Sequence, residues 1–460
     1  MLSHFRSRLA LFAAAGVTVY FLYFFGLTRA GMLGPDEPRY ASIGRDMARS
    51  GDWVTPRLWG KPWFEKPALL YWMTGTAYLM GLPDDLAPRL PVAAMAVGFL
   101  VFFWRELRRE YGERVAWYAG TILGTSAGWL AFGHVATTDM PLSACFGGAM
   151  LLVLRQFSQP RKRTAVVAGI LLGLAVLAKG LVPFILFLPA IWFLRRQPVL
   201  VAITLAAGLV VAAPWYTLVT VRNGMPFIDE FIIKHHFARF TTASLQHVQK
   251  WWFYIPVLLG SLFPWTPSLL LLFRRGLYVN SRERFLLAWA VLGLAFFSAS
   301  QNKLPSYLLP MLPPLAALLG LGLAQARTAK WILAATGALI CTVPVITYLL
   351  PDALVRGITK ASVHFQTGFV PIAILLGLLL WLLAGQRRPD WAMAALAVLM
   401  VISVINLVWN TYPILDTVYS ARGLWRSAGF AGCADDLPRS KWYGLNYYAR
   451  KSVPDCIQSP

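Results

Sequence analysis

Apolar segments with the length of a bilayer span recur along nearly the whole chain, and they constrain the fold more than any other feature. A hydrocarbon core of ~30 Å needs roughly 20 mostly apolar residues as helix. Thirteen windows fit this scale, the shortest least well: 9–27, 86–104, 115–132, 140–156, 164–179, 181–194, 199–219, 254–273, 285–299, 305–325, 331–350, 367–385 and 391–410. The sequence therefore predicts an all-α polytopic membrane protein with about 13 transmembrane helices.

The composition excludes the main alternatives to a membrane fold. Only 13% of the residues are charged and 58% are hydrophobic, whereas an average soluble domain carries about 25% charged residues. Aromatic residues make up 14% of the chain, which argues against disorder. The four cysteines are too few and too scattered for a disulfide framework or a zinc site.

The distribution of arginine predicts the orientation in the membrane. The net charge of +22 has to be divided between the two sides of the bilayer before it says anything about a partner. Every second loop is short and dense in arginine, as in 105–114, 155–163 and 274–284. The positive-inside rule places these loops in the cytoplasm. We expect an uncleaved first helix, a cytoplasmic N-terminus and a periplasmic C-terminus.

The first outer loop, residues 28–85, holds most of the polar residue types from which a catalytic site is built. Asp36 follows a proline and precedes a helical pattern, which makes it a candidate N-cap. Tyr40, Ile43 and Met47 follow at helical spacing, so we expect an amphipathic helix lying on the membrane surface. Glu65 and Lys66 form an acid–base pair ahead of a second surface helix.

Several motifs resemble the aminoarabinose–lipid A transferase family, which is related to the protein O-mannosyltransferases and has the GT-C fold. In the first outer loop these are Asp36-Glu37-Pro38-Arg39-Tyr40, Ser50-Gly51-Asp52-Trp53-Val54, Phe64-Glu65-Lys66-Pro67 and Tyr71-Trp72. Later motifs are Thr137-Thr138-Asp139, Ala178-Lys179-Gly180, His235-His236-Phe237-Ala238-Arg239-Phe240 and Gln301-Asn302-Lys303-Leu304-Pro305-Ser306-Tyr307. The resemblance covers roughly residues 10–325.

The resemblance implies a transmembrane catalytic domain over residues 1–410, with catalytic loops at 28–85 and 220–252. Members of the family often carry a sizeable periplasmic C-terminal domain, and residues 411–460 are expected to be a reduced form of it. The implied reaction moves a sugar from a polyprenyl phosphate to lipid A or another envelope glycan at the periplasmic face of the bacterial inner membrane. A secreted-protein acceptor, as in the O-mannosyltransferases, is the alternative within this class.

The chemistry requires a base for the acceptor, and carboxylates are the usual choice. Asp36 is the first candidate for this base, and the resemblance suggests Asp139 as a second essential carboxylate. Each has a structural alternative as a helix cap. Glu65 is the third candidate catalytic residue and could orient Lys66; its alternative is a surface ion pair with Lys66.

The leaving lipid phosphate requires cations and hydrogen-bond donors. Lys66 and Arg239 are the main candidates, followed by Arg39, His236 and the pair Lys303 and Tyr307. Lys66 has snorkelling to the interface as its alternative, Arg239 has attraction to lipid headgroups, and Tyr307 has the aromatic belt. We place Lys303 and Tyr307 one helical turn apart. Lys179-Gly180 is interpreted as a helix stop.

Two further expectations concern metals and cysteines. Glu65 and His236 are the candidate ligands of a divalent metal. Cys433 and Cys456 both fall in the outer tail, where a disulfide is allowed.

Two other functional classes predict different sequences. A lipid or solute transporter predicts charged residues within the apolar windows or broken helices in matching halves. A non-catalytic scaffold predicts no gathering of acids and phosphate-type cations in one outer loop. The enzyme predicts that gathering.

Overall fold

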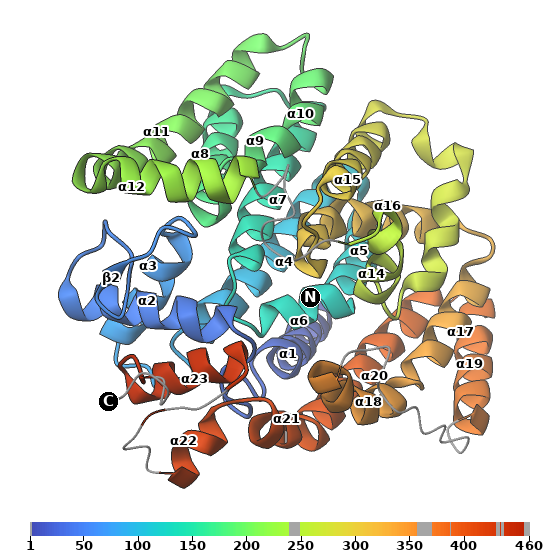
Figure 1. Cartoon of the computed structure of the whole chain (residues 1–460). Coiled ribbons are helices and arrows are strands. Elements are labelled where there is room, and N and C mark those ends of the chain that lie inside the picture. Colours follow the sequence, from blue (N-terminus) through green and yellow to red (C-terminus); the bar gives the residue numbers. More distant parts are fainter. Residues whose placement is uncertain are drawn as a thin grey trace.

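The protein is a bundle of helices with one small hairpin (Figure 1). The computed structural model describes residues 2–238, 249–356, 370–386, 388–428, 433 and 437–454. In chain order the elements are α1 (Leu2–Tyr23), α2 (Asp36–Ser50), β1 (Arg57–Leu58), β2 (Lys61–Pro62), α3 (Leu69–Leu79), α4 (Arg89–Tyr111), α5 (Glu113–Thr125), α6 (Ala127–Gly133), α7 (Asp139–Gln156), α8 (Lys162–Lys179), α9 (Val182–Leu186), α10 (Leu188–Phe193), α11 (Pro198–Asn223), α12 (Met225–Phe227), η1 (Ile228–Ala238), η2 (Trp251–Phe253), α14 (Tyr254–Ser261), η3 (Thr266–Phe273), η4 (Arg275–Tyr278), α15 (Ser281–Ala299), η5 (Pro305–Met311), α16 (Leu312–Gln325), α17 (Ala329–Ile340), α18 (Val343–Arg356), α19 (Val370–Gly385), α20 (Pro389–Asn410), α21 (Tyr412–Val418), α22 (Arg422–Ala428) and α23 (Arg439–Ala449). The strands pair antiparallel, with Arg57 opposite Pro62 and Leu58 opposite Lys61.

Every apolar window of the sequence coincides with one helix or with two successive helices. The segment 254–273 becomes α14 and η3, which meet at an angle of 115°. The segment 331–350 becomes α17 and α18, with a bend of 49°. Prolines lie at both bends, at Pro264 and Pro344, where they remove backbone donors and clash with the preceding turn. The proline in each run therefore accounts for its bend.

Helix length and composition identify part of the predicted set of spans. Within the described ranges, α4, α11, η5 with α16, and α20 with α21 are four segments long and apolar enough to cross a membrane, and the two bent pairs raise this to six. Several of the remaining apolar helices are shorter, such as Val182–Phe193. The total of thirteen spans and the orientation of the termini stay predictions.

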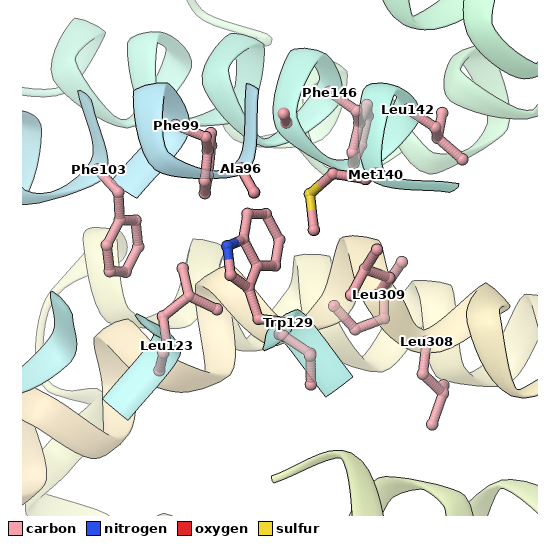
Figure 2. Packing of buried hydrophobic residues seen from close by; sticks show 14 of the residues in the cluster. Ala96, Phe99, Phe103, Leu123, Trp129, Met140, Leu142, Phe146, Leu308 and Leu309 are labelled. Atoms are coloured by element: carbon pink, nitrogen blue, oxygen red, sulfur yellow. The ribbon is translucent and has the colours of Figure 1, made fainter. Parts of the chain in front are cut away.

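Trp129 of α6 is the centre of the core between α4, α7 and η5 (Figure 2). Its side chain is fully buried, and its ring centroid lies 5.1 Å from that of Phe99. Met140 and Leu309 approach it from the first turn of α7 and from η5 (Figure 2). Between membrane helices such a side chain contributes through van der Waals packing, because lipid is as apolar as the protein core. Met140 lies in the first turn of α7 and directly follows Asp139. Its packing in this core therefore fixes the end of α7 that carries Asp139 against η5.

The first outer loop is embedded in protein, which corrects the expected surface helix. Helix α2 packs against α3 on one side and α23 on the other. Tyr40, Ile43 and Met47 are buried as the helical spacing predicts, but protein rather than lipid covers this apolar face. Gly44 allows the close crossing, because a Cβ there would lie 2.7 Å from the Thr74 Cβ atom.

The C-terminal segment closes over this loop. Arg422 donates to Asp85 at 2.7 Å and pairs with Asp416 at 2.7 Å, and it also donates to the backbone oxygens of Thr28 and Arg29. Residues that follow the last apolar window are thereby tied to both ends of the first outer loop.

The structure gives the state of three of the four cysteines. Cys145 and Cys341 are free thiols, with Cys145 buried. Cys433 is disulfide-bonded, while Cys456 lies outside the described residues.

Candidate active site

Both candidate carboxylates occupy the first turn of a helix, and neither is an N-cap. The N-cap of α2 is Pro35 and that of α7 is Thr138, and neither cap makes a side-chain hydrogen bond. The predicted capping role of Asp36 and Asp139 is therefore wrong. Each carboxylate instead pairs with a cation. The positive end of the helix dipole still favours an anion in the first turn.

Asp36 begins a chain of alternating charges that continues to Lys66. Arg39 forms an ion pair with Asp36, as their spacing on α2 predicts, and a second one with Glu65 at 3.1 Å. Glu65 Oε1 lies 3.4 Å from Lys66 Nζ. The exposed side-chain fractions are 44% for Asp36, 3% for Arg39, 14% for Glu65 and 10% for Lys66. The ion pair of Glu65 with Lys66 is thus largely buried and is not a surface pair. Asp36 is the accessible end of this series of ion pairs.

Aromatic rings surround the Arg39 guanidinium. It lies 5.4 Å from the ring centroid of Tyr40, 5.5 Å from that of Trp63 and 5.2 Å from that of Tyr443. Tyr443 comes from α23, so the C-terminal segment completes the setting of this arginine. Burial alone would lower the pKa of Arg39, but the charges of Tyr40, Glu65 and Asp36 raise it above its ordinary value. Arg39 therefore remains a fixed cation that orients both acids.

Glu37 and Arg89 form a buried pair for which the sequence analysis proposed no role. Arg89 Nε and Nη2 each donate to Glu37 at 2.7 Å. Arg89 also donates to the backbone oxygens of Leu27, Ala30 and Gly31. Bidentate arginine–carboxylate pairs are the strongest of the charge-assisted contacts. The signal was present, because Glu37 belongs to the motif that begins at Asp36.

Glu37 also connects the two candidate loops. Its Oε1 atom accepts a hydrogen bond from the backbone N–H of Ala136 at 3.0 Å, three residues before Asp139. Its Oε2 atom accepts one from the backbone N–H of Leu33 at 2.8 Å. The buried Glu37 carboxylate therefore ties the backbone that precedes Asp36 to the backbone that precedes Asp139.

A second cluster joins Asp139, Lys179 and Tyr307. Lys179 Nζ donates to Asp139, and the same ammonium lies 4.5 Å from the ring centroid of Tyr307. Lys179 was interpreted only as part of a helix stop. Gly180 does end α8, with φ +86°, but the lysine side chain belongs to this cluster.

Lys303 and Tyr307 do not share a helical turn as predicted. Lys303 precedes η5, and its ammonium donates to the backbone oxygens of Ser300 and Gln249, the latter at 3.2 Å. Tyr307 lies within η5, with its ring centroid 5.0 Å from that of Phe297. Pro305 at the start of η5 explains the difference, because residues before a proline avoid the helical conformation.

The first outer loop contacts the beginning of the loop at 220–252. Arg222 pairs with Asp52 at 3.0 Å, and Asn223 donates to the Thr55 hydroxyl at 3.0 Å. Next to Glu65, the Phe64 ring centroid lies 5.4 Å from that of Phe227. This contact places the residue before η1 beside the segment that carries Glu65.

The predicted metal ligands and the last predicted cation fall partly beyond the description. The backbone of His236 belongs to η1, while its side chain and all of Arg239 lie outside the described residues. Across the described part of the chain, no three His, Cys, Asp or Glu side chains form a group able to hold a metal. Glu65 already faces Arg39 and Lys66, so its surroundings do not fit a metal ligand, and no step is derived through a metal.

Replacing Lys179 by methionine tests the second cluster. Lys179→Met should lower the transfer rate by about tenfold or more, because it leaves Asp139 partly buried without its cation. Lys179→Arg keeps the charge and should retain most of the activity. The measurement is the initial rate of sugar transfer by purified protein. Wild-type rates in Lys179→Met would contradict a functional cluster.

Comparison with known proteins identifies the relatives of this chain. Residues 62–218 match the family model described as dolichyl-phosphate-mannose-protein mannosyltransferase. An undecaprenyl phosphate-alpha-4-amino-4-deoxy-L-arabinose arabinosyl transferase of Pseudomonas fluorescens is 30% identical over 429 residues, covering 85% of this chain and 75% of the relative. The corresponding enzyme of Pseudomonas aeruginosa UCBPP-PA14 is 28% identical, covering 94% and 86%.

Solved structures show the same fold. ArnT from Cupriavidus metallidurans bound to undecaprenyl phosphate superposes with a TM-score of 0.75 at 23% identity, covering 96% of this chain and 85% of that one. The archaeal oligosaccharyltransferase AglB from Archaeoglobus fulgidus superposes with a TM-score of 0.54 at 14% identity, covering 98% and 64%. The predicted GT-C fold is confirmed, and the chain is a multi-pass protein of a bacterial inner membrane.

The relatives agree over most of their length and of this chain, and the fold agrees with theirs. The motifs around Asp139 and Lys179 lie within residues 62–218, which match the family model. The chain belongs to the family of undecaprenyl phosphate-aminoarabinose arabinosyl transferases, which are membrane glycosyltransferases.

Proposed function

We propose that the protein transfers a sugar from a polyprenyl phosphate to lipid A or a related envelope glycan at the periplasmic face of the inner membrane. The observation that carries this proposal is the chain of charges from Asp36 to Lys66. One accessible carboxylate stands at the end of a buried series of ion pairs. A base needs access to its substrate, and the groups that orient it need rigid surroundings.

Asp36 is the proposed base. The acceptor oxygen attacks the anomeric carbon and passes its proton to Asp36. The bond between that carbon and the phosphate oxygen breaks in the same displacement, and the polyprenyl phosphate leaves. A single displacement with inversion is the expectation from the family. The ion pair with Arg39 holds the Asp36 carboxylate in place.

Cations and donors near the two clusters are proposed to hold the lipid phosphate as its charge develops. Lys66 is the central group, and Lys303, Tyr307, His236, Arg39 and Arg239 are proposed to share this task. Asp139 is proposed to position Lys179 at the second cluster. Electrostatic stabilisation of a developing anion is commonly the largest contribution to catalysis.

The proposed topology follows from the chemistry. A cytoplasmic N-terminus and a periplasmic C-terminus put Asp36 and Lys66 at the outer leaflet. Residues 1–410 are proposed as the catalytic transmembrane domain and 411–460 as a reduced periplasmic segment. Support comes from α23, whose Tyr443 ring lies against Arg39.

The double substitution Lys66→Ala with Arg239→Ala tests the phosphate clamp. It should weaken binding of undecaprenyl phosphate by about tenfold or more, since charge-assisted contacts to phosphate are lost. Binding to the purified protein in detergent is the measurement. The matched control is a double variant in the hairpin, Lys61→Ala with Arg57→Ala, where the Lys61 side chain is exposed. Wild-type affinity in the Lys66 and Arg239 double variant would contradict the clamp.

The transfer itself is tested with purified components. The full chain is incubated with undecaprenyl-phosphate aminoarabinose and lipid A, and the lipids are analysed by mass spectrometry. Lipid A heavier by one sugar residue supports the proposal. Envelope lipids and glycans from cells with and without the gene extend the test to other sugars. A sugar found only on secreted proteins would overturn the lipid or glycan acceptor.

A further inference from the structure

A basic cleft lies on the opposite end of α2 from Asp36. Its volume is about 460 Å³, and it lies between the last turns of α2, the end of α3 with the turn that follows, and the residue after α23. Arg45, Arg49 and Arg450 line it together with a single carboxylate, Asp84. Because one carboxylate balances only one of three guanidinium groups, the lining side chains carry a net positive charge.

Arg45 is a buried donor with unused hydrogen-bonding capacity. The residue is 3% exposed, its Nη2 atom donates to the backbone oxygen of Tyr447 at 2.8 Å, and Nη1 lies 3.5 Å from Asp84. Within the described ranges, Nε and Nη1 have no hydrogen-bond partner. Buried polar atoms are almost always paired in folded proteins. Because Nη1 already forms an ion pair with Asp84, Nε is the Arg45 donor left without a partner in the described ranges, and it indicates a ligand with acceptor oxygens.

The cleft is assembled from segments that meet only in the folded chain. Arg450 Nη2 lies 2.9 Å from Asp84, whose other oxygen faces Arg45. Asp84 thus holds two arginines on opposite walls, while Arg49 is exposed at the last turn of α2. A phosphate dianion suits such a setting, since several guanidinium groups can donate to its oxygens at once.

Two exposed apolar side chains lie at one side of the cleft: Leu79, which lines it, and Met80, which follows in the chain. Leu79 is 63% exposed and the adjacent Met80 is 75% exposed. Exposed apolar side chains beside a cationic cleft fit an amphiphile, whose acyl part is apolar and whose head is anionic. A free phosphate ion would gain no binding energy from these apolar side chains. The combination favours a phosphate carried by a lipid.

We propose that this cleft binds a phosphate group of the acceptor glycolipid while another part of the same molecule lies at Asp36. The inference rests on the proposed function and adds a subsite to it. Arg45 follows Asp36 by nine residues on one helix, which is about 13 Å along its axis at 1.5 Å per residue. A phosphorylated disaccharide lipid is long enough to reach both positions. Nine residues are also about 2.5 helical turns, which puts the two side chains on opposite faces of α2, so the acceptor has to extend around this helix to reach both.

Binding measurements on the full chain in detergent test the subsite without requiring turnover. The probes are lipid A with its phosphates, the same lipid A after enzymatic dephosphorylation, and phosphatidylglycerol. Wild type should bind the phosphorylated lipid A about tenfold more tightly than the dephosphorylated form. Arg49→Gln combined with Arg450→Gln should abolish this difference and leave binding of undecaprenyl phosphate unchanged.

Two further variants keep the test decisive. Arg426→Gln removes an exposed arginine outside the cleft and should preserve the difference. Arg45→Lys keeps the buried charge but loses the planar donors, and it should reduce the difference once an unchanged melting temperature shows that the variant is folded.

Two results would overturn the proposal. An undiminished phosphate preference in the Arg49 and Arg450 variant would exclude the cleft as the phosphate site. An equal loss of affinity for phosphatidylglycerol would assign the cleft to a bilayer lipid instead of the acceptor. Phosphate-dependent binding without any transfer of sugar would refute the proposed function and leave the subsite standing.

Discussion

Asp36→Asn is expected to abolish sugar transfer while the protein stays folded and inserted. The amide has the shape of the carboxylate but cannot accept the acceptor proton, and a general base contributes roughly 10²–10⁴-fold to a rate. Asp36 is 44% exposed, so the substitution removes no buried packing. The measurement is the initial rate with saturating donor, together with the melting temperature in detergent.

Controls separate this effect from a general loss of charge. Asp229→Asn neutralises an exposed aspartate in the first turn of η1 and should retain wild-type turnover. Undecaprenyl phosphate should bind Asp36→Asn with nearly wild-type affinity, since the base does not hold the donor. Normal turnover in Asp36→Asn would remove this residue from the mechanism.

Arg89→Met is expected to cause the largest loss of stability. The substitution keeps most of the side-chain volume but leaves Glu37 fully buried without its cation. Removing one partner of a buried pair costs about 3–5 kcal/mol. The backbone oxygens of Leu27, Ala30 and Gly31 lose their donor as well. Thermal unfolding in detergent is the measurement, and a markedly lower midpoint is the expected result.

Two variants show whether the charge is the cause. Glu37→Met combined with Arg89→Met removes both charges and should be more stable than Arg89→Met alone, because no unpaired buried charge remains. Arg105→Met changes an exposed arginine of the same helix and should shift stability by no more than about 0.5 kcal/mol. Equal midpoints for Arg89→Met and Arg105→Met would show that the buried pair contributes little.

The helices could be located from the sequence because their signal is local. Each apolar window is a continuous run, and a run of that length in a bilayer has to satisfy its own backbone as helix. Bends were predictable where a proline lies in the run, as at Pro264. The total number of spans was not, because short helices such as α9 and α10 differ little from buried helices of a soluble protein in length and composition.

The candidate site was predictable only in part. The pairing of Asp36 with Arg39 follows from their spacing on one helix. The partner of Asp139 did not follow, because Lys179 lies 40 residues away on another helix. The helix stop at Gly180 gave Lys179 a sufficient local explanation and concealed its contact with Asp139.

The surroundings of α2 show the same limit. Tyr40, Ile43 and Met47 predict an apolar face, but periodicity does not distinguish lipid from protein as its cover. The contacts of α2 with α23 show that protein covers this side of the helix. One of these contacts joins Arg45 to Tyr447, 402 residues away in the sequence.

The sequence by itself determined a polytopic helical membrane protein and its family, because apolar length and contiguous motifs are properties of short segments. Only the tertiary structure decided which charges meet: Arg39 with Glu65 and Tyr443, Glu37 with Arg89, and Asp139 with Lys179. Charged side chains can pair with any opposite charge that the fold brings near them. Their partners are therefore fixed by the packing of distant helices, and no local pattern records that packing.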